Sequence, residues 1–368
     1  MTDSRSVGVE EELLLVEPDT GQPAAVAGTV MRAAADSGRE PGTGQDLEFE
    51  LQLQQLETNS EPCHTLDELG RELARGRAAA ASAAEHAGVQ VAALATSPVP
   101  VEPTLMPKPR YQEMAEAFGL TVDEQLTCGC HVHVEISSPD EGIAVLDRIQ
   151  PWLAPLLALS ANSPFWHGAD SSYASFRYQA WGRWPSSGPV QRFGTTEAYR
   201  QTVRQMVATQ TLLDTGMVYF DARLSEHYPT IEIRIADVCL YRDDAVLIAA
   251  LARALVETEA RAWREDKPGA AERVELLRLA AWRASRSGLD EMLLDPVTGL
   301  PERASAVVAT LVRHVEEALE DAGDRVSVTS LLEAILARGN GAVFQRDVYQ
   351  RCGELSGVAK QAVAVTAR

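Results

Sequence analysis

The pattern of apolar and polar residues predicts short strands in the first two thirds of the chain. Strand side chains alternate between two faces, so a strand shows a period of two, or a short apolar run where both faces are buried. Such segments span residues 7–16, 46–57, 89–95, 129–136, 218–224 and 230–238. Turn-forming Gly, Pro and Asp residues bound most of them, which favours separate strands.

A helical pattern, with apolar residues three or four apart, fills most of the remaining sequence. It predicts helices over residues 29–35, 66–86, 111–118, 140–161 and 195–213. From Asp243 to the end the pattern is almost wholly helical, with breaks at 267–269 and 295–299. Strands first and helices last indicate the α+β class. A doubly wound sheet is disfavoured because no glycine-rich phosphate loop follows a strand.

The segment 7–16 carries three consecutive carboxylates inside an apolar run. In an extended chain Glu10 and Glu12 share one face, and Glu11 points to the other. Two carboxylates side by side repel each other, so a buried face would hold them only around a cation. The alternative is a solvated edge strand, and this segment alone does not decide between the two.

The segment 46–57 supplies further carboxylates. Glu48 and Glu50 share the polar face of the expected strand. Glu57 lies an odd number of residues further on, so a slip or bend is needed to bring it to the same side.

Two later strands carry polar pairs at alternate positions. His131 and His133 share one face, which indicates ligands or phosphate contacts, although core histidines are an alternative. Zinc is one option, but many carboxylates and few histidines suit Mg²⁺ or Mn²⁺ better. Glu232 and Arg234 form a second pair, either a surface ion pair or a cation ligand beside a phosphoryl-binding guanidinium.

Composition and charge exclude several classes of function. The 368 residues are 45% hydrophobic and carry a formal charge of −20, which argues against a nucleic-acid-binding surface. No apolar run reaches the roughly 18 residues of a membrane helix, and the start has no signal-peptide form. We therefore expect a cytoplasmic protein without membrane contact. Five scattered cysteines predict no disulfide framework.

The ordered set of these motifs resembles a known family. The set comprises residues 8–12, Glu50 with Glu57, residues 129–134 and residues 230–234, and the loop 174–177 and the segment 295–299 also match. It is similar to the carboxylate–amine ligases, or type-2 glutamate–cysteine ligases, of the glutamine synthetase-like superfamily. The resemblance covers nearly the whole chain. It implies one catalytic domain over 1–368, with an antiparallel sheet lining a funnel, helices outside and a helical region from about 243 to 368.

The resemblance also implies roles for individual residues, carried over at matching positions. The metal shell for Mg²⁺ or Mn²⁺ would be Glu10, Glu12, Glu50, Glu57, His131 and Glu232. His133 would lie near ATP and Arg234 at the transferred phosphoryl group, while Arg177 would take the acceptor carboxylate. Arg110 and Tyr111 match the family pattern without an assigned role.

The implied activity is ATP-dependent amide formation through an acyl phosphate, with glutamate and cysteine or another amine as substrates. Such chemistry needs clamped metal ions and an arginine rather than a protein nucleophile. Two alternatives stay open: a metal-dependent hydrolase using His131 and His133, and a non-catalytic nucleotide-binding relative. A homodimer is expected from exposed sheet edges. Glu11, off the site, is expected to tolerate replacement far better than Glu10 or Glu12.

Overall fold

The centre of the protein is a seven-stranded antiparallel sheet, seen here in a computed structural model that describes residues 4–36, 47–269 and 272–367. Its strands run in the order β2-β3-β1-β5-β9-β8, and β4 also pairs with β1. Their bounds are Val7–Val16 (β1), Leu47–Phe49 (β2), Gln55–Asn59 (β3), Gln90–Ala92 (β4), Gly129–Glu135 (β5), Ala222–Leu224 (β8) and Thr230–Asp237 (β9). The predicted α+β class with an antiparallel sheet is confirmed.

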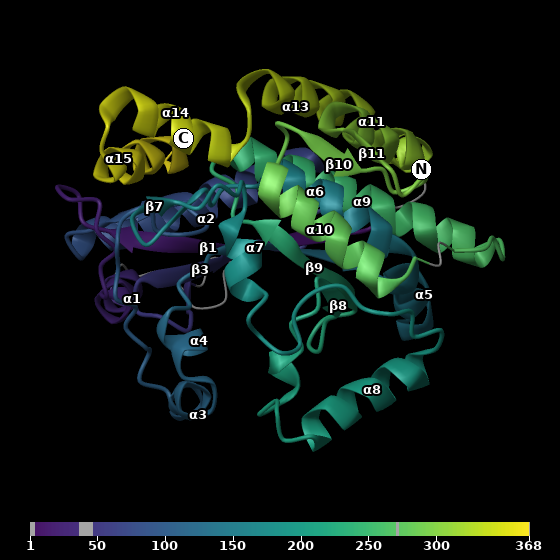
Figure 1. Cartoon of the computed structure of the whole chain (residues 1–368), viewed down its shortest axis with the longest axis horizontal. Helices are drawn as coiled ribbons and strands as arrows, with labels where there is room; N and C mark the ends of the chain where they lie inside the picture. The colour runs from purple at the N-terminus through teal and green to yellow at the C-terminus, as the bar shows by residue number, and fades with distance from the viewer. Residues whose placement is uncertain (1–3, 37–46, 270–271, 368) are drawn as a thin grey trace.

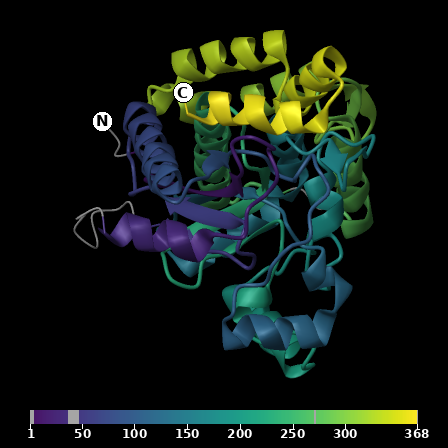
Figure 2. The ribbon, with the colours of Figure 1, turned by 90° about the vertical axis from the view of Figure 1, so that its left-hand side faces the viewer.

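Helices cover one face of this sheet, above it in Figure 1. They include α2 (Leu66–His86), α6 (Leu153–Ser160) and α9 (Arg242–Arg264), and α5 (Pro139–Ile149) packs against α9 at the right-hand end of the sheet in that view. On the opposite side, α3 (Pro109–Phe118) and α4 (Leu120–Asp123) lie below one end of the sheet, and α8 (Thr196–Ala208) lies below the other (Figures 1 and 2).

The last part of the chain is helical, as expected. After α9 come α10 (Val274–Ser287), α11 (Ala304–His314), α12 (Glu316–Asp321), α13 (Arg325–Arg338), α14 (Gly341–Cys352) and α15 (Leu355–Thr366). A small hairpin of β10 (Met292–Leu294) and β11 (Pro301–Arg303) interrupts them at the predicted break. Whether the chain is a single domain stays a prediction.

Local chemistry explains why α2 begins where the sequence predicts. Thr65 accepts a hydrogen bond from the Glu68 backbone, and the Glu68 side chain accepts one from the Thr65 backbone. This capping box satisfies two amide groups that the first helical turn leaves free. Leu69, Leu73 and Ala80 then face the core.

One apolar helical segment, Pro139–Ser160, is long enough to cross a membrane by length and composition. Its most apolar window is 94% buried inside the protein, which is the behaviour of a core segment. The sequence predicts one helix over 140–161. The structure divides it at a 3₁₀ turn over Gln150–Trp152, where Pro151 lacks the amide hydrogen an α-helix needs.

The predicted strand 46–57 is interrupted, and its first residue, Asp46, lies outside the described residues. Between β2 and β3 the backbone turns to pair with the Pro-rich loop, with Leu53 N donating to Thr104 O and Met106 N to Leu51 O. The bend that Glu57 requires is therefore present. Glu57 is paired opposite Glu12 of β1.

Candidate active site

Strand register brings the predicted site residues together on the face of the sheet that the helical layer leaves open. In the β1–β5 pair, Glu10 lies opposite His131, and in the β5–β9 pair, His133 lies opposite Glu232. Directly opposed residues on one face of a sheet have adjacent side chains. Residues more than two hundred positions apart therefore share one surface.

This surface forms the floor of a pocket of about 290 Å³. Eight predicted residues line it: Glu10, Glu12, Glu50, Glu57, His131, His133, Glu232 and Arg234. The side walls come from α3 and from the chain around β8, with Arg110, Tyr111 and Arg223 among their residues. We predicted from the sequence that these eight residues come together, and the structure brings them together. Their roles stay predictions.

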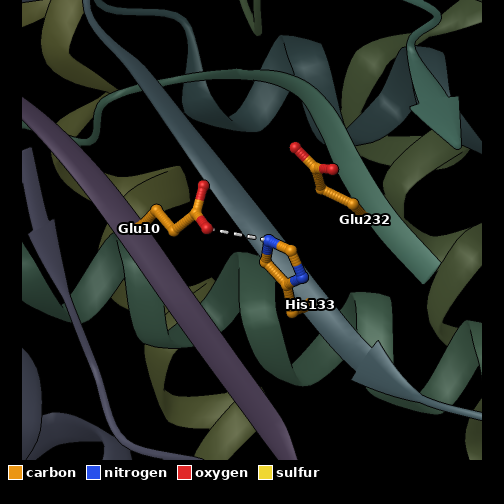
Figure 3. A group of neighbouring side chains, drawn as sticks. All are labelled: Glu10, His133 and Glu232. Carbon is orange, nitrogen blue, oxygen red and sulfur yellow. Dashed lines mark ion pairs between the residues drawn. The ribbon is translucent and has the colours of Figure 1, made fainter. Parts of the chain in front are cut away.

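The first group of possible cation ligands is Glu10, His133 and Glu232, whose side chains point toward one another from three adjacent strands (Figure 3). One ligand atom of each lies within 4.8 Å of the others. His133 Nε2 lies 3.0 Å from Glu10 Oε1, and Nδ1 is 2.9 Å from Thr230 Oγ1. These two contacts orient the His133 imidazole toward the Glu10 and Glu232 carboxylates.

The second group consists of Glu12, Glu50 and Glu57, again with ligand atoms within 4.8 Å of one another. The Glu12 carboxylate also accepts a hydrogen bond of 2.6 Å from the Gly129 amide. The sequence predicted that the five carboxylates and His131 form one metal-binding shell. Among the described residues, the structure shows two groups of three possible ligands, and the first group contains His133.

His131 lies between the two groups. Its Nδ1 is 3.0 Å from Glu10 Oε2, and its Nε2 is 3.8 Å from Glu12 Oε1. A proton on Nδ1, donated to Glu10, leaves a lone pair on Nε2. Burial and the charge of Arg234 lower the pKa of His131, which favours this neutral form.

The electrostatics of the pocket fit a hard divalent cation. Burial and the neighbouring Glu50 raise the pKa of Glu12, and burial with the Glu50 and Glu10 charges raises that of Glu57 well above the ordinary value. Three converging carboxylates are therefore unfavourable without a positive partner. The buried Nε2 atom of His131 has no hydrogen-bond partner. These donors are of the type that Mg²⁺ or Mn²⁺ accepts.

Arg234 provides positive charge beside the first group. Its guanidinium is paired with Glu232, and Arg223 binds the same carboxylate at 2.6 Å. Burial by itself would raise the pKa of Glu232, but the two arginines outweigh it and lower that pKa to about 2. Glu232 therefore stays ionised and holds Arg234 against the pocket floor.

Arg177 occupies a different position from the one expected of a substrate ligand. It lies in the first turn of α7 (Phe176–Trp181), is 2% exposed and does not line the pocket. Its Nη1 and Nη2 atoms lie 3.4 Å from the carbonyl oxygens of Ile235 and Arg234. Arg177 thus contacts the backbone of β9 and lies outside the lining of the pocket. Its contact with the acceptor carboxylate stays a prediction.

The profile of glutamate–cysteine ligase family 2 matches residues 6–364. The chain belongs to this family. The predicted resemblance is confirmed, and the protein is an ATP-dependent ligase.

Relatives of this ligase cover almost its full length. A Streptomyces avermitilis protein named "Putative glutamate--cysteine ligase 2-1" is 53% identical over 98% of this chain and 99% of its own. A Mycolicibacterium smegmatis protein named "Putative glutamate--cysteine ligase 2-3" is 38% identical over 100% of this chain and 99% of its own.

Solved structures share the fold of the ligase at low sequence identity. The glutamate–cysteine ligase of Francisella tularensis, solved in complex with AMP, has a TM-score of 0.69 at 13% identity, covering 100% of this chain and 89% of that one. A bifunctional glutathione synthetase from Pasteurella multocida has a TM-score of 0.67 at 16% identity, covering 99% of this chain and 52% of that one.

Several pocket residues of the ligase were not assigned from the sequence. Arg223 lies opposite Glu232 in the β8–β9 hairpin, so a correct hairpin register would have found it. Tyr219 and Arg110 reach the pocket from chain segments outside the sheet. Arg110 matched the family pattern, but the apolar and polar periodicity did not predict that its side chain faces the pocket.

Gly129 lies where the Glu12 carboxylate, the Arg177 guanidinium and the His131 imidazole come close together. We predict that Gly129→Ala impairs the ligase site. A Cβ there would overlap the Arg177 guanidinium and come within 3.0 Å of His131 Nε2. Overpacking of this kind costs about 1–3 kcal/mol, and it would displace groups beside Glu12. Lower stability in chemical denaturation and weaker Mg²⁺ activation are expected.

Gly8→Ala on β1 is the matched control for that substitution. A Cβ at Gly8 would meet nothing nearer than the Ser60 hydroxyl at 3.7 Å, an ordinary contact. If both alanine variants behave like the wild type, the close packing around Gly129 does not constrain the site.

Asp221, behind the pocket wall, gives a prediction about pH. Burial raises its pKa to about 7, although Tyr178 donates a 3.0 Å hydrogen bond to it. The folded state thus holds a proton that the unfolded chain releases above about pH 4, so this group's contribution to stability falls as pH rises toward 7. Chemical denaturation between pH 5 and 8 should give a smaller loss of stability for Asp221→Asn than for the wild type. Equal losses would contradict the raised pKa.

Proposed function

We propose that the ligase joins the γ-carboxyl group of glutamate to the amine of cysteine, with Mg²⁺ or Mn²⁺ as its metal. The observation that carries the proposal is the pair of carboxylate-rich groups beside Arg234, within one pocket of a family-2 chain. The names of the relatives support glutamate and cysteine as substrates.

The metal-binding part of the proposal rests on the two groups of ligands. Glu10, His133 and Glu232 would hold one divalent ion, and Glu12, Glu50 and Glu57 another, with His131 between them. Bound there, divalent ions would neutralise the charge of the ATP phosphates and orient the γ-phosphoryl group.

Within the chain, Arg234 has the charge and position to stabilise the transferred phosphoryl group. Glu232 fixes this guanidinium, and Arg223 shares the carboxylate so that Glu232 does not take up a proton at neutral pH. A positioned arginine beside developing phosphoryl charge is a recurring requirement of such transfers. His133, in the first group of ligands, would lie near a nucleotide phosphate.

The reaction would follow two displacements. A glutamate γ-carboxylate oxygen attacks the γ-phosphorus and ADP leaves, which makes the acyl phosphate. The amine nitrogen then attacks the acyl carbon, the phosphate leaves with its bridging oxygen, and the amine loses a proton. The positive charges of the pocket favour the oxyanion formed in the second step.

The hydrolase alternative predicts turnover without ATP, and membership of a ligase family does not favour it. The non-catalytic alternative is likewise disfavoured because the chain is an enzyme. The cytoplasmic location and the homodimer stay predictions.

The test is ADP release across a panel of acids and amines with Mg²⁺, followed by mass spectrometry of the product. We expect release only with glutamate and an amine together, and γ-glutamylcysteine as the preferred product. Product from another acid, with none from glutamate and any amine, would refute glutamate as the substrate.

A further inference from the structure

Arg110 extends into the pocket from the first turn of α3, with weak hydrogen-bond acceptors at one edge of its guanidinium. Its Nε and Nη2 donate to the two carboxylate oxygens of Asp214, at 2.6 and 2.8 Å. Its Nη1 donates to the Met114 sulfur, at 3.3 Å, and the guanidinium also donates to the Tyr219 hydroxyl. A thioether and a neutral phenol are weaker acceptors than a carboxylate, so this edge can exchange them for a substrate carboxylate.

The other two arginines that line the described pocket differ from Arg110 in this respect. Arg223 donates to Glu232 through Nε and Nη2 and to the Val218 carbonyl through Nη1, at 3.0 Å. Arg234 is buried against Glu232 on the pocket floor. Arg110 is 39% exposed, so a ligand can reach this edge without breaking a buried ion pair.

The surroundings of Arg110 suit a carboxylate. Its guanidinium carbon lies 6.0 Å from the Tyr111 ring, and Tyr219 lines the same pocket. Burial and the Glu50 charge raise the pKa of Tyr111 to about 12, so this phenol keeps its proton at neutral pH and can donate. Trp181 and Trp184 line the same pocket and add apolar surface to it. A charge-assisted, two-donor contact is the usual way in which arginine recognises carboxylates.

We propose that Arg110 is a specificity-determining residue that binds a free carboxylate of an amino-acid substrate, one that is not activated in the reaction. This inference rests on the proposed function, because both glutamate and cysteine carry such an α-carboxylate. Asp214 holds the guanidinium from its other edge and keeps the exchangeable edge toward the pocket.

The experiment compares Arg110→Gln and Arg110→Lys with the wild-type enzyme and with Arg183→Gln. Arg183 is a matched control, since its ion pair with Glu124 is similarly exposed, 32% and 40% against 39% and 41% for Arg110 and Asp214, and it does not line the pocket. The acid arm pairs glutamate with 4-aminobutyrate, which lacks the α-carboxylate. The amine arm pairs cysteine with cysteamine, which lacks the carboxylate.

In one of the two arms, Arg110→Gln should lower kcat/KM for the parent substrate by about 10–100-fold, mainly through KM. The same variant should leave kcat/KM for the analogue within about twofold of the wild type. The arm with the difference identifies the substrate bound. Arg110→Lys keeps the charge without the planar fork, so it should recover part of the loss, and Arg183→Gln should lose nothing.

Equal losses for parent and analogue in both arms, or no loss at all, would overturn the proposal. A binding measurement separates this failure from a failure of the proposed function. Thermal shifts induced by glutamate, 4-aminobutyrate, cysteine and cysteamine need no turnover, and Arg110→Gln should abolish only the shift of a parent amino acid. If neither parent shifts the wild-type protein, the proposal fails. If a parent shifts it but no amide forms, the substrate assignment fails and Arg110 is still tested.

Discussion

Glu12→Gln is expected to lower ligase turnover by about 10³-fold or more while leaving the metal-free protein as stable as the wild type, or more stable. Gln keeps the oxygen that accepts the Gly129 hydrogen bond but lacks the charge that a divalent ion needs. Metal polarisation is worth several kcal/mol in such transition states, and about 1.4 kcal/mol corresponds to a factor of ten.

The stability half of this prediction follows from the pKa of Glu12. Burial and Glu50 raise it, so keeping the carboxylate ionised at neutral pH opposes folding. Removing the charge removes that penalty. ADP release and chemical denaturation without metal, measured on the same preparation, test both halves.

Glu48→Gln serves as the control for Glu12→Gln. Glu48 is exposed on β2, receives a 3.0 Å hydrogen bond from Asn59 and does not line the pocket. It should keep wild-type turnover. Wild-type turnover in Glu12→Gln as well would remove Glu12 from the metal-binding groups.

Glu11→Ala is expected to lower the free energy of unfolding by about 3–5 kcal/mol, which reverses the expectation that this residue tolerates replacement. Glu11 is fully buried on the helix-facing side of β1 and pairs with Arg77 of α2 at 2.6 and 2.9 Å. Arg77 also donates to the carbonyls of Cys239 and Leu240 just after β9. The substitution leaves a buried guanidinium without its counter-ion.

The double variant Glu11→Gln/Arg77→Met tests whether the unpaired charge causes that loss. Replacing both partners by neutral groups of similar size removes the buried charge, so it should cost less than Glu11→Ala alone. Urea denaturation of the wild type, Glu11→Ala, the single variants Glu11→Gln and Arg77→Met, and the double variant gives the comparison. A double variant as unstable as the sum of its single variants would indicate that the pair is not coupled.

Strand periodicity explains how much of the site was predictable. It assigned Glu10 and Glu12 to one face and Glu11 to the other, and the register of β1, β5 and β9 gathers the histidines and Glu232 as that alternation requires. The bounds of α2 were also predictable, because a capping box starts it and apolar spacing defines its core face. These features depend on neighbours within a few residues.

Features that depend on distant segments were not predictable. The turn between β2 and β3 arises because the backbone near Leu51 and Leu53 pairs with the Pro-rich loop, which a local pattern cannot indicate. The partner of Glu11 lies 66 residues away on α2. Arg177 and Arg110 both belong to segments outside the sheet, and only the folded chain shows that Arg110 lines the pocket and Arg177 does not.

The two faces of β1 make its alignment with its neighbours an all-or-none property. A shift of pairing by one residue would turn Glu10 and Glu12 into the helix-packed interior and point Glu11 into the pocket. Arg77 would then lose its counter-ion and the pocket would lose two carboxylates together. A chain with shifted pairing therefore loses the Glu11–Arg77 ion pair and the two pocket carboxylates together. Deleting one residue within β1 should consequently leave no partly active protein.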